Sequence, residues 1–591
     1  MAKELSRYLT ALDAAFLYFE KPTEAMHIGS CMVYEGRMER QELIELLEKR
    51  LHLTPRYRQR VVFPPFAANH PFWIDDPEFD ISAHVEEVEL EGPVTEEAFA
   101  RVAAEAYQGP LPRKRPLWSA TLIHGLPGDN TGIVWKVHHA MIDGVSGIDL
   151  TMVLNGFSPK DADPPEPSGP WSPEPLPDPF SLMHEAVRER VANYGRAFTD
   201  ALFESFRPES VAKRLEMMRE ASGPTLPKVL RPAPRTRFNK RVSGQLGWAW
   251  RELSFTEVRQ VKSVLGGTVN DLVLAVLSGG VGKYLREKGD DTSGLELRAM
   301  CPVSMRQADE RGQLGNLVSV MIAPLHVGIE DPIERHQAGI EGMTRNKEAR
   351  QAEAFYEMTQ WSDLVPPVSQ ALAGRLPIPP TLFNTVSTNV PGPQIPLFQA
   401  GRRCLSWLPM GVVTSGIGLF TSILTYDKRI TLGTTVDAKL IPDPWRLSEC
   451  IRDAYEELRD LAGVKPVPFE SFPLGASTHP YSSLAAASEV EPPSPAIGPA
   501  SAEPPAAKKA SRKATARKKS ARRKATKAKT AKKKAVAKAS KKVTKAKTAK
   551  KKSVAKASKK VTKKKAAKKK AATSTRKKGS TRKKSSSRKK S

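Results

Sequence analysis

Nine prolines fall within residues 159–179, and this segment separates two longer parts of the chain. A stretch so rich in proline and so poor in large apolar residues cannot form a helix or a central strand, so we expect an extended crossover. Residues 158–240 as a whole are predicted to hold this crossover and its connecting helices. Residues 1–157 and 241–475 alternate helical and strand-like patterns. The sequence therefore predicts an α/β protein with two lobes and an active site between them.

Individual elements can be placed from periodicity. Helical faces mark residues 43–51, 99–106 and 269–285. Strand-like runs occupy residues 117–124, 131–138, 318–327, 412–426 and 429–436, and a turn at 126–130 joins the first two as a hairpin. Residues 183–206 carry one apolar stripe flanked by arginines, which is typical of a connecting helix packed on the body. The same stripe would also suit an amphipathic helix on an anionic membrane.

The C-terminal residues 476–591 have no core-forming pattern. Residues 507–591 hold 41 lysines and arginines and no carboxylate, which leaves 52 basic against 64 acidic residues for the rest. An 18-residue repeat occurs at 526–543 and again at 544–561. Charge of one sign at this density predicts a disordered tail. It is expected to bind DNA without reading sequence, or anionic lipid, through the same electrostatics.

Several observations bear on the compartment. The four cysteines lie far apart without a CxxC pair, which is typical of free thiols in a reducing compartment. Glu4, Asp13 and Glu20 interrupt the apolar N-terminal stretch, so we expect no signal peptide. No run of about 18 uncharged apolar residues occurs, so we expect no transmembrane helix. The chain is predicted to be cytoplasmic, and peripheral to the inner face of the membrane or to lipid inclusions.

The candidate chemistry centres on His138 and His139, at the end of a strand that reads as half-buried, followed by Asp143 and Gly144. Adjacent strand residues point to opposite faces, so only one imidazole is expected to enter a given cavity. From these residues alone, three interpretations stand: a buried and satisfied histidine pair, a metal site, or a general base. The metal site is the weakest, because HExxH spacing and nearby cysteines are both absent.

The sequence lacks the motifs of several other enzyme classes, which narrows the range of possible reactions. The residues around Ser146 do not form a GxSxG elbow, and Gly279 to Lys283 lack the spacing of a phosphate-binding loop. No GxGxxG dinucleotide fingerprint occurs either. What remains is general-base chemistry on a substrate that arrives already activated.

These residues resemble a known family. His138, His139, Asp143 and Gly144 match the HHxxxDG motif of the CoA-dependent acyltransferase superfamily. Further matches resemble the bacterial wax ester synthase/diacylglycerol acyltransferases within it. They are Leu12 to Leu17, Arg115-Pro116-Leu117-Trp118, Val269-Asn270-Asp271-Leu272, Pro302 to Arg306, Gly315-Asn316 and Ser387 to Pro393. They follow the family's order across roughly residues 5–470, whereas the basic tail is no part of the pattern.

The resemblance implies a tunnel between the lobes, with acyl-CoA as substrate and no cofactor or metal. It implies that His139 deprotonates the acceptor hydroxyl, with His138, Asp143 and Gly144 completing the motif and Asp143 orienting it. The acyl group would pass to diacylglycerol, and also to long-chain alcohols. The substrate-binding residues it implies are Pro116, Leu117, Trp118, Asn270, Asp271, Ser387 and Asn389.

Plainer interpretations stand beside several of these assignments. Asn270 is also compatible with a helix N-cap, residues 387–393 with a turn, and Pro116 to Trp118 with core packing. For the whole chain, one alternative is a nucleoid- or inclusion-binding scaffold whose acyltransferase body is inactive. Another is the same fold acting on a different acceptor.

Overall fold

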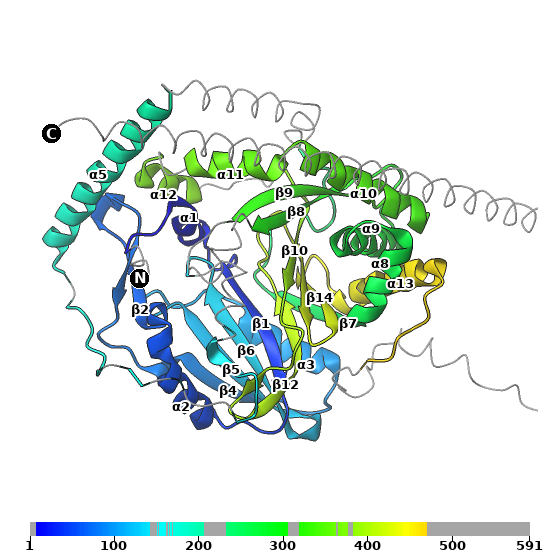
Figure 1. Ribbon diagram of the computed structural model, residues 1–591, viewed down its shortest axis with the longest axis horizontal. Helices are drawn as coiled ribbons and strands as arrows, with labels where there is room; N and C mark the ends of the chain where they lie inside the picture. Colours follow the sequence, from blue (N-terminus) through cyan, green and yellow to red (C-terminus); the bar gives the residue numbers. More distant parts are fainter. Residues whose placement is uncertain are drawn as a thin grey trace, which may run out of the picture. The chain divides into compact units, whose positions relative to one another are not determined.

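The computed structural model describes residues 7–141, 151, 153–160, 164, 166–167, 169–175, 177–205, 232–304, 318–361, 365–375 and 382–469. Its described part contains two six-stranded mixed sheets, one in each lobe, which confirms the predicted two-lobed α/β fold (Figure 1). No single helix in these ranges is long and apolar enough to cross a membrane.

The first sheet has the strand order β11-β12-β1-β6-β5-β4. Its strands are β1 (His27–Tyr34), β4 (Val85–Glu89), β5 (Trp118–Leu126), β6 (Asn130–His138), β11 (Phe398–Gln399) and β12 (Arg402–Met410). Helices α2 (Arg40–Arg50) and α3 (Glu96–Tyr107) pack against it through Leu43 and Phe99. The predicted hairpin is confirmed as β5 and β6, joined at Pro127–Asp129.

Two strands of the first sheet come from the C-terminal half of the chain. Strand β12 pairs antiparallel with β1, from Gly29 opposite Met410 to Tyr34 opposite Cys404. The Trp407 indole N–H also donates to the Ser30 hydroxyl at 2.8 Å. The backbone of one half therefore completes the sheet of the other, which ties the two lobes together.

The second sheet has the order β7-β14-β13-β10-β8-β9. Its strands are β7 (Leu246–Ser254), β8 (Leu297–Ser304), β9 (Val318–Leu325), β10 (Thr385–Pro391), β13 (Leu419–Tyr426) and β14 (Arg429–Asp437). Helices α8 (Phe255–Leu265), α9 (Val269–Glu287) and α13 (Pro444–Ala462) lie together against one side of it (Figure 1).

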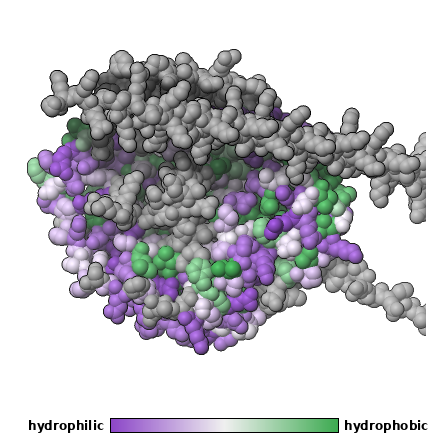
Figure 2. Space-filling view, viewed as in Figure 1, coloured by the Kyte–Doolittle hydropathy of each residue, from purple (hydrophilic) through white to green (hydrophobic). Residues whose placement is uncertain are grey.

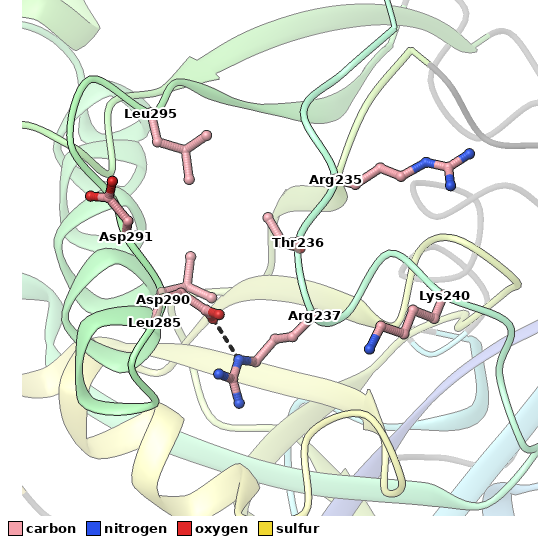
Figure 3. A pocket seen from close by; sticks show the side chains of 8 residues that line it. All are labelled: Arg235, Thr236, Arg237, Lys240, Leu285, Asp290, Asp291 and Leu295. Atoms are coloured by element: carbon pink, nitrogen blue, oxygen red, sulfur yellow. Dashed lines mark hydrogen bonds and ion pairs between the residues drawn. The ribbon is translucent and has the colours of Figure 1, made fainter.

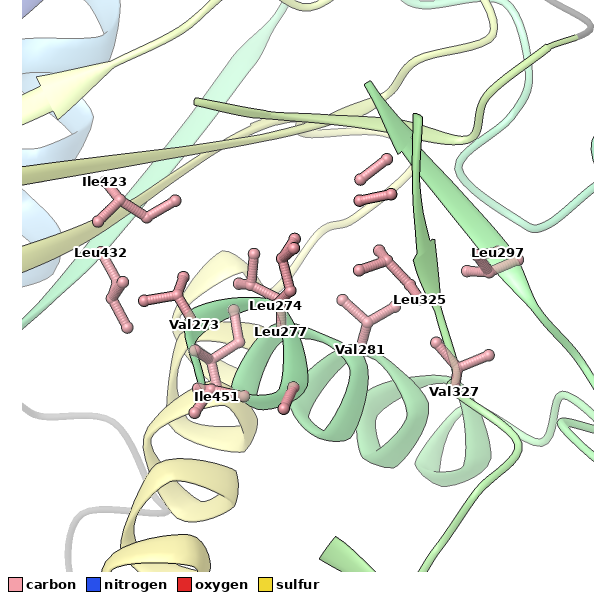
Figure 4. Packing of buried hydrophobic residues seen from close by; sticks show 14 of the residues in the cluster. Val273, Leu274, Leu277, Val281, Leu297, Leu325, Val327, Ile423, Leu432 and Ile451 are labelled. Carbon is pink, nitrogen blue, oxygen red and sulfur yellow. The ribbon is translucent and has the colours of Figure 1, made fainter. Parts of the chain in front are cut away.

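Helix α9 lies at the centre of the second lobe. Its apolar residues face the sheet and α13, with Leu274 and Val281 among them (Figure 4). Gly280 makes a close approach possible, because a Cβ there would lie 2.5 Å from the Ile451 Cα of α13. The glycine run that begins at Gly279 therefore serves helix packing.

The remaining described elements surround this framework. They are α1 (Ala11–Phe19), β2 (Gln59–Val62), β3 (Phe72–Asp75), α5 (Pro179–Ser205), α10 (Pro332–Glu348), α11 (Gln351–Trp361) and α12 (Pro367–Arg375). The predicted helix at 183–206 corresponds to α5. On the face seen in Figure 2, the described surface is largely hydrophilic, with small apolar patches. All four cysteines are buried and unpaired, as predicted.

Candidate active site

Strand β6 carries the histidine pair to the end of the first sheet. It lies between β1 and β5, and His138 stands opposite His27 of β1. The expectation of a half-buried strand is wrong, because β6 is covered on both faces. Val134 packs in the cluster that includes α3, and Ile133 packs in the cluster that includes α2.

Both ring nitrogens of His138 face protein groups. The Ala140 backbone N–H donates to Nδ1 at 3.1 Å, and Nε2 lies 3.3 Å from a carboxylate oxygen of Glu20. The backbone N–H of His138 donates to the Leu117 carbonyl at 2.9 Å. Its side chain is fully buried. These contacts hold the His138 ring in one orientation.

His139 has different surroundings. It is half-buried, and its ring stacks on Phe16 of α1 with centroids 4.0 Å apart and planes 8° apart. Its backbone N–H donates to the Met26 carbonyl at 2.8 Å. The sequence predicts that only one imidazole enters a given cavity, but His139 is the first residue after β6, so the turn that follows the strand places its ring. Asp143 and Gly144, which complete the motif, lie outside the described residues.

Pro116, Leu117 and Trp118 are buried in the first lobe. The Trp118 indole N–H donates to the Tyr57 carbonyl at 2.9 Å, and its ring stacks on His84. Because Leu117 also accepts the His138 N–H, this segment holds the end of β6 in place. All of these contacts are consistent with the interpretation that Pro116, Leu117 and Trp118 pack in the core.

Asn270 and Asn389 come together in the second lobe. The Asn389 side-chain amide donates to the Asn270 Oδ1 at 3.4 Å. Asn270 is not the N-cap of α9, because Thr268 holds that position. Residues 385–391 form β10 and are not a turn, since β10 pairs in parallel with β13 along its length.

Asp271 takes part in the cap of α9, and Ser387 is buried in a strand. The Asp271 carboxylate accepts from the Thr268 N–H at 2.8 Å and hydroxyl at 2.9 Å, and Thr268 caps the Asp271 N–H in return. This reciprocal capping fixes the start of α9. Ser387 is buried in β10, two residues before Asn389.

Three charged or polar residues beside the histidines are absent from the sequence-based site. Glu20 contacts His138, as described above. His27 is buried against Tyr107, and burial together with nearby Lys136 and His138 lowers its pKa well below the usual range. Burial also lowers the pKa of Lys136 to about 8, although Glu86 and Glu20 oppose that shift. The only sequence signal for Glu20 was a charge inside an apolar stretch.

Two described cavities differ in character. A small one of about 20 Å³ is lined from the first lobe by His27 and Tyr107 and from the C-terminal half by Leu246 and Val413. A larger one of about 470 Å³ lies between residues 235–240 and the end of α9 (Figure 3). In the larger cavity the guanidinium of Arg237 pairs with Asp290 at 2.6 Å. This ion pair neutralises part of the positive charge that lines the cavity.

Comparison with known proteins agrees with this architecture. Residues 9–273 match the wax ester synthase/diacylglycerol acyltransferase catalytic domain, and residues 314–459 match the C-terminal domain of the same family. A putative diacylglycerol O-acyltransferase of Mycobacterium tuberculosis H37Rv is 29% identical over 487 residues, covering 78% of this chain and 99% of that protein. A probable diacylglycerol O-acyltransferase of the same strain is 29% identical over 470 residues, covering 76% and 95%.

A solved structure is similar in fold. It is the wax ester synthase/diacylglycerol acyltransferase from Marinobacter aquaeolei VT8, with a TM-score of 0.54 and 21% identity, covering 77% of this chain and all of that one. The two family domains together span well over half of the residues. The chain therefore belongs to the wax ester synthase/diacylglycerol acyltransferase family, and it is an acyltransferase.

Proposed function

We propose that this acyltransferase moves a long-chain fatty acyl group from acyl-CoA to diacylglycerol, and also to long-chain alcohols. Family membership and the names of the mycobacterial relatives support diacylglycerol as the main acceptor. The single observation that carries the mechanism is the asymmetry of the histidine pair. His138 has both nitrogens against protein groups, whereas His139 is half-buried beside an aromatic ring.

In this proposal His139 is the general base. It takes the proton of the acceptor hydroxyl, and the resulting alkoxide oxygen attacks the thioester carbonyl carbon. The tetrahedral intermediate collapses with cleavage of the carbon–sulfur bond, and the departing CoA thiolate takes the proton from the imidazolium. No acyl-enzyme is formed. Asn270 and Asn389 supply polar groups for the acyl donor, and Asp143 orients the motif.

We propose that the body reaches its lipid substrates from a membrane or inclusion surface. Phe66 is 89% exposed and Phe180 is 83% exposed. Helix α5 packs on the body at Ala186, whose carbonyl accepts from Asn69, while Val187 and Val191 of its apolar stripe remain exposed. Flotation with anionic vesicles tests this: Phe66→Ser with Val191→Glu should reduce recovery of the protein with lipid. Unchanged recovery would contradict it.

The basic tail is proposed to bind DNA through counterion release. The full chain should stay on a DNA column at low salt and leave it steeply as salt rises, whereas residues 1–480 should not be retained. Equal retention by both would end this proposal. Retention of the full chain by anionic vesicles alone would point to lipid as the tail's partner.

Thiol release tests the proposed reaction. The full chain is mixed with palmitoyl-CoA and either diacylglycerol, hexadecanol or no acceptor, and free CoA and neutral lipid are measured together. We expect acceptor-dependent release with matching triacylglycerol, and a smaller yield of wax ester. Absence of any acceptor-dependent release would favour the inactive scaffold, and release only with another class of alcohol or amine would favour a different acceptor.

A further inference from the structure

The buried carboxylate of Glu20 lies next to His138 and accepts a hydrogen bond from Met26, which in turn contacts His139. Glu20 directly follows α1, and its side chain is 3% exposed. One carboxylate oxygen accepts from the Met26 N–H at 3.1 Å and lies 3.3 Å from His138 Nε2. The other accepts from the Arg113 guanidinium at 3.1 Å. Both oxygens are therefore engaged.

The contacts of His138 show which of its ring nitrogens carries the proton. Since the Ala140 N–H donates to Nδ1, the proton of the neutral ring lies on Nε2, which faces Glu20. Burial alone would raise the pKa of Glu20, but the adjacent His138 ring and the hydrogen bonds from Met26 and Arg113 hold it below its usual value. The carboxylate is therefore charged at neutral pH, and it orients the His138 ring.

Glu20 is also connected to His139 through two other residues, Met26 and Phe16. The segment from Glu20 to Met26 is fastened by the Met26 N–H, and the Met26 carbonyl accepts the His139 N–H at 2.8 Å. The Glu20 N–H donates to the carbonyl of Phe16 at 3.2 Å, and the Phe16 ring is stacked on His139. The bond to Phe16 joins backbone atoms and stays in any variant, whereas loss of the carboxylate would release the Met26 N–H and so loosen the carbonyl that holds His139.

We propose that Glu20 is a positioning residue for acyl transfer, which holds His138 and, through Met26, sets the place of His139. This rests on the proposed role of His139 as the base. Displacement of a reacting group by about 1 Å costs up to about 100-fold in rate. Loss of the carboxylate should therefore lower kcat and leave substrate binding intact.

The test compares Glu20→Gln with Glu257→Gln in the full chain. Glu257 of α8 is a matched control, because it is also buried and accepts from the Tyr455 hydroxyl at 2.7 Å and the Val467 N–H at 2.7 Å, with no described contact to either histidine. Steady-state rates with palmitoyl-CoA and diacylglycerol are measured beside the melting temperature. We expect Glu20→Gln to lose about 10- to 100-fold in kcat with KM for both substrates within about twofold.

The control should behave differently. Glu257→Gln is expected to lower the melting temperature by a similar amount while kcat stays within about twofold of the parent. Equal kcat values for the two variants, or a loss in Glu20→Gln that only follows its unfolded fraction, would overturn the positioning role. A parent protein that transfers no acyl group would instead refute the proposed function.

A second variant covers failure of Glu20→Gln to fold. The Arg113 side chain is 38% exposed, so Arg113→Gln is expected to fold while it removes one of the partners of Glu20. Its kcat should fall about three- to tenfold at unchanged KM. An unchanged kcat in this variant would overturn the proposal.

Discussion

The ring of Phe16 lies almost parallel to the imidazole of His139, with 4.0 Å between centroids and 8° between planes. A stacked pair of this kind contributes about 0.5–1.5 kcal/mol beyond simple burial. Phe16→Leu keeps an apolar side chain but removes the flat contact that restrains the imidazole. We expect kcat to fall about three- to tenfold with KM nearly unchanged. Steady-state kinetics would contradict this role if KM alone changed.

His138 should matter more for stability than for chemistry. Removing its ring leaves a buried cavity and deprives the charged Glu20 of a partner. Such a change costs about 2–4 kcal/mol. We expect His138→Ala to lower the free energy of unfolding by that amount, measured in urea, while kcat of the folded fraction falls less than in His139→Ala. A His138→Ala protein of parental stability would be inconsistent with this arrangement.

Lys136 gives the fold a pH dependence. Its pKa is lowered from 10.5 to about 8 by burial, so the folded protein disfavours the charged amine. The resulting stability is complete above pH 10.5 and is lost as pH falls through about 8, a difference of about 3 kcal/mol. Between pH 8 and 10.5, the melting temperature of the parent should rise relative to that of Lys136→Met. Parallel curves would contradict the prediction.

Asn270 and Asp271 are neighbours for which we expect different effects. Asp271 belongs to the capping box of α9, so Asp271→Ala should cost about 1 kcal/mol of stability. Its kcat/KM should change little. Asn270→Ala should leave stability within about 0.5 kcal/mol and lower kcat/KM about tenfold, because the proposal places its amide against the acyl donor. Thermal melts and kinetics on both variants decide this, and a reversal of the two effects would refute it.

Much of the fold is predictable from local pattern. Helix α9 and strand β6 were expected at nearly their observed bounds, because each has a long run of strong periodicity. Strand β12 was not expected in the first sheet. Its partner β1 lies more than 360 residues away in the sequence, and no local signal specifies such a pairing. For β10 a turn was an open alternative, because the strand ends at Pro391 and Gly392 and Pro393 follow directly.

The candidate site is also predictable from the sequence only in part. His138 and His139 stand out because their motif is contiguous. Glu20 does not, since its contact with Arg113 spans 93 positions and its contact with His138 spans still more. The capping role of Asp271 also needed the structure, since Asn270 was an open alternative for the N-cap position that Thr268 holds. Contacts between distant segments are the part that the sequence could not supply.

The central claim is that one imidazole, His139, takes the acceptor proton. The most direct measurement is single-turnover release of CoA from palmitoyl-CoA by His139→Ala in the presence of diacylglycerol, with circular dichroism to show that the variant is folded. We expect release to fall by at least about 100-fold. A folded His139→Ala protein that makes triacylglycerol at the parental rate would contradict it.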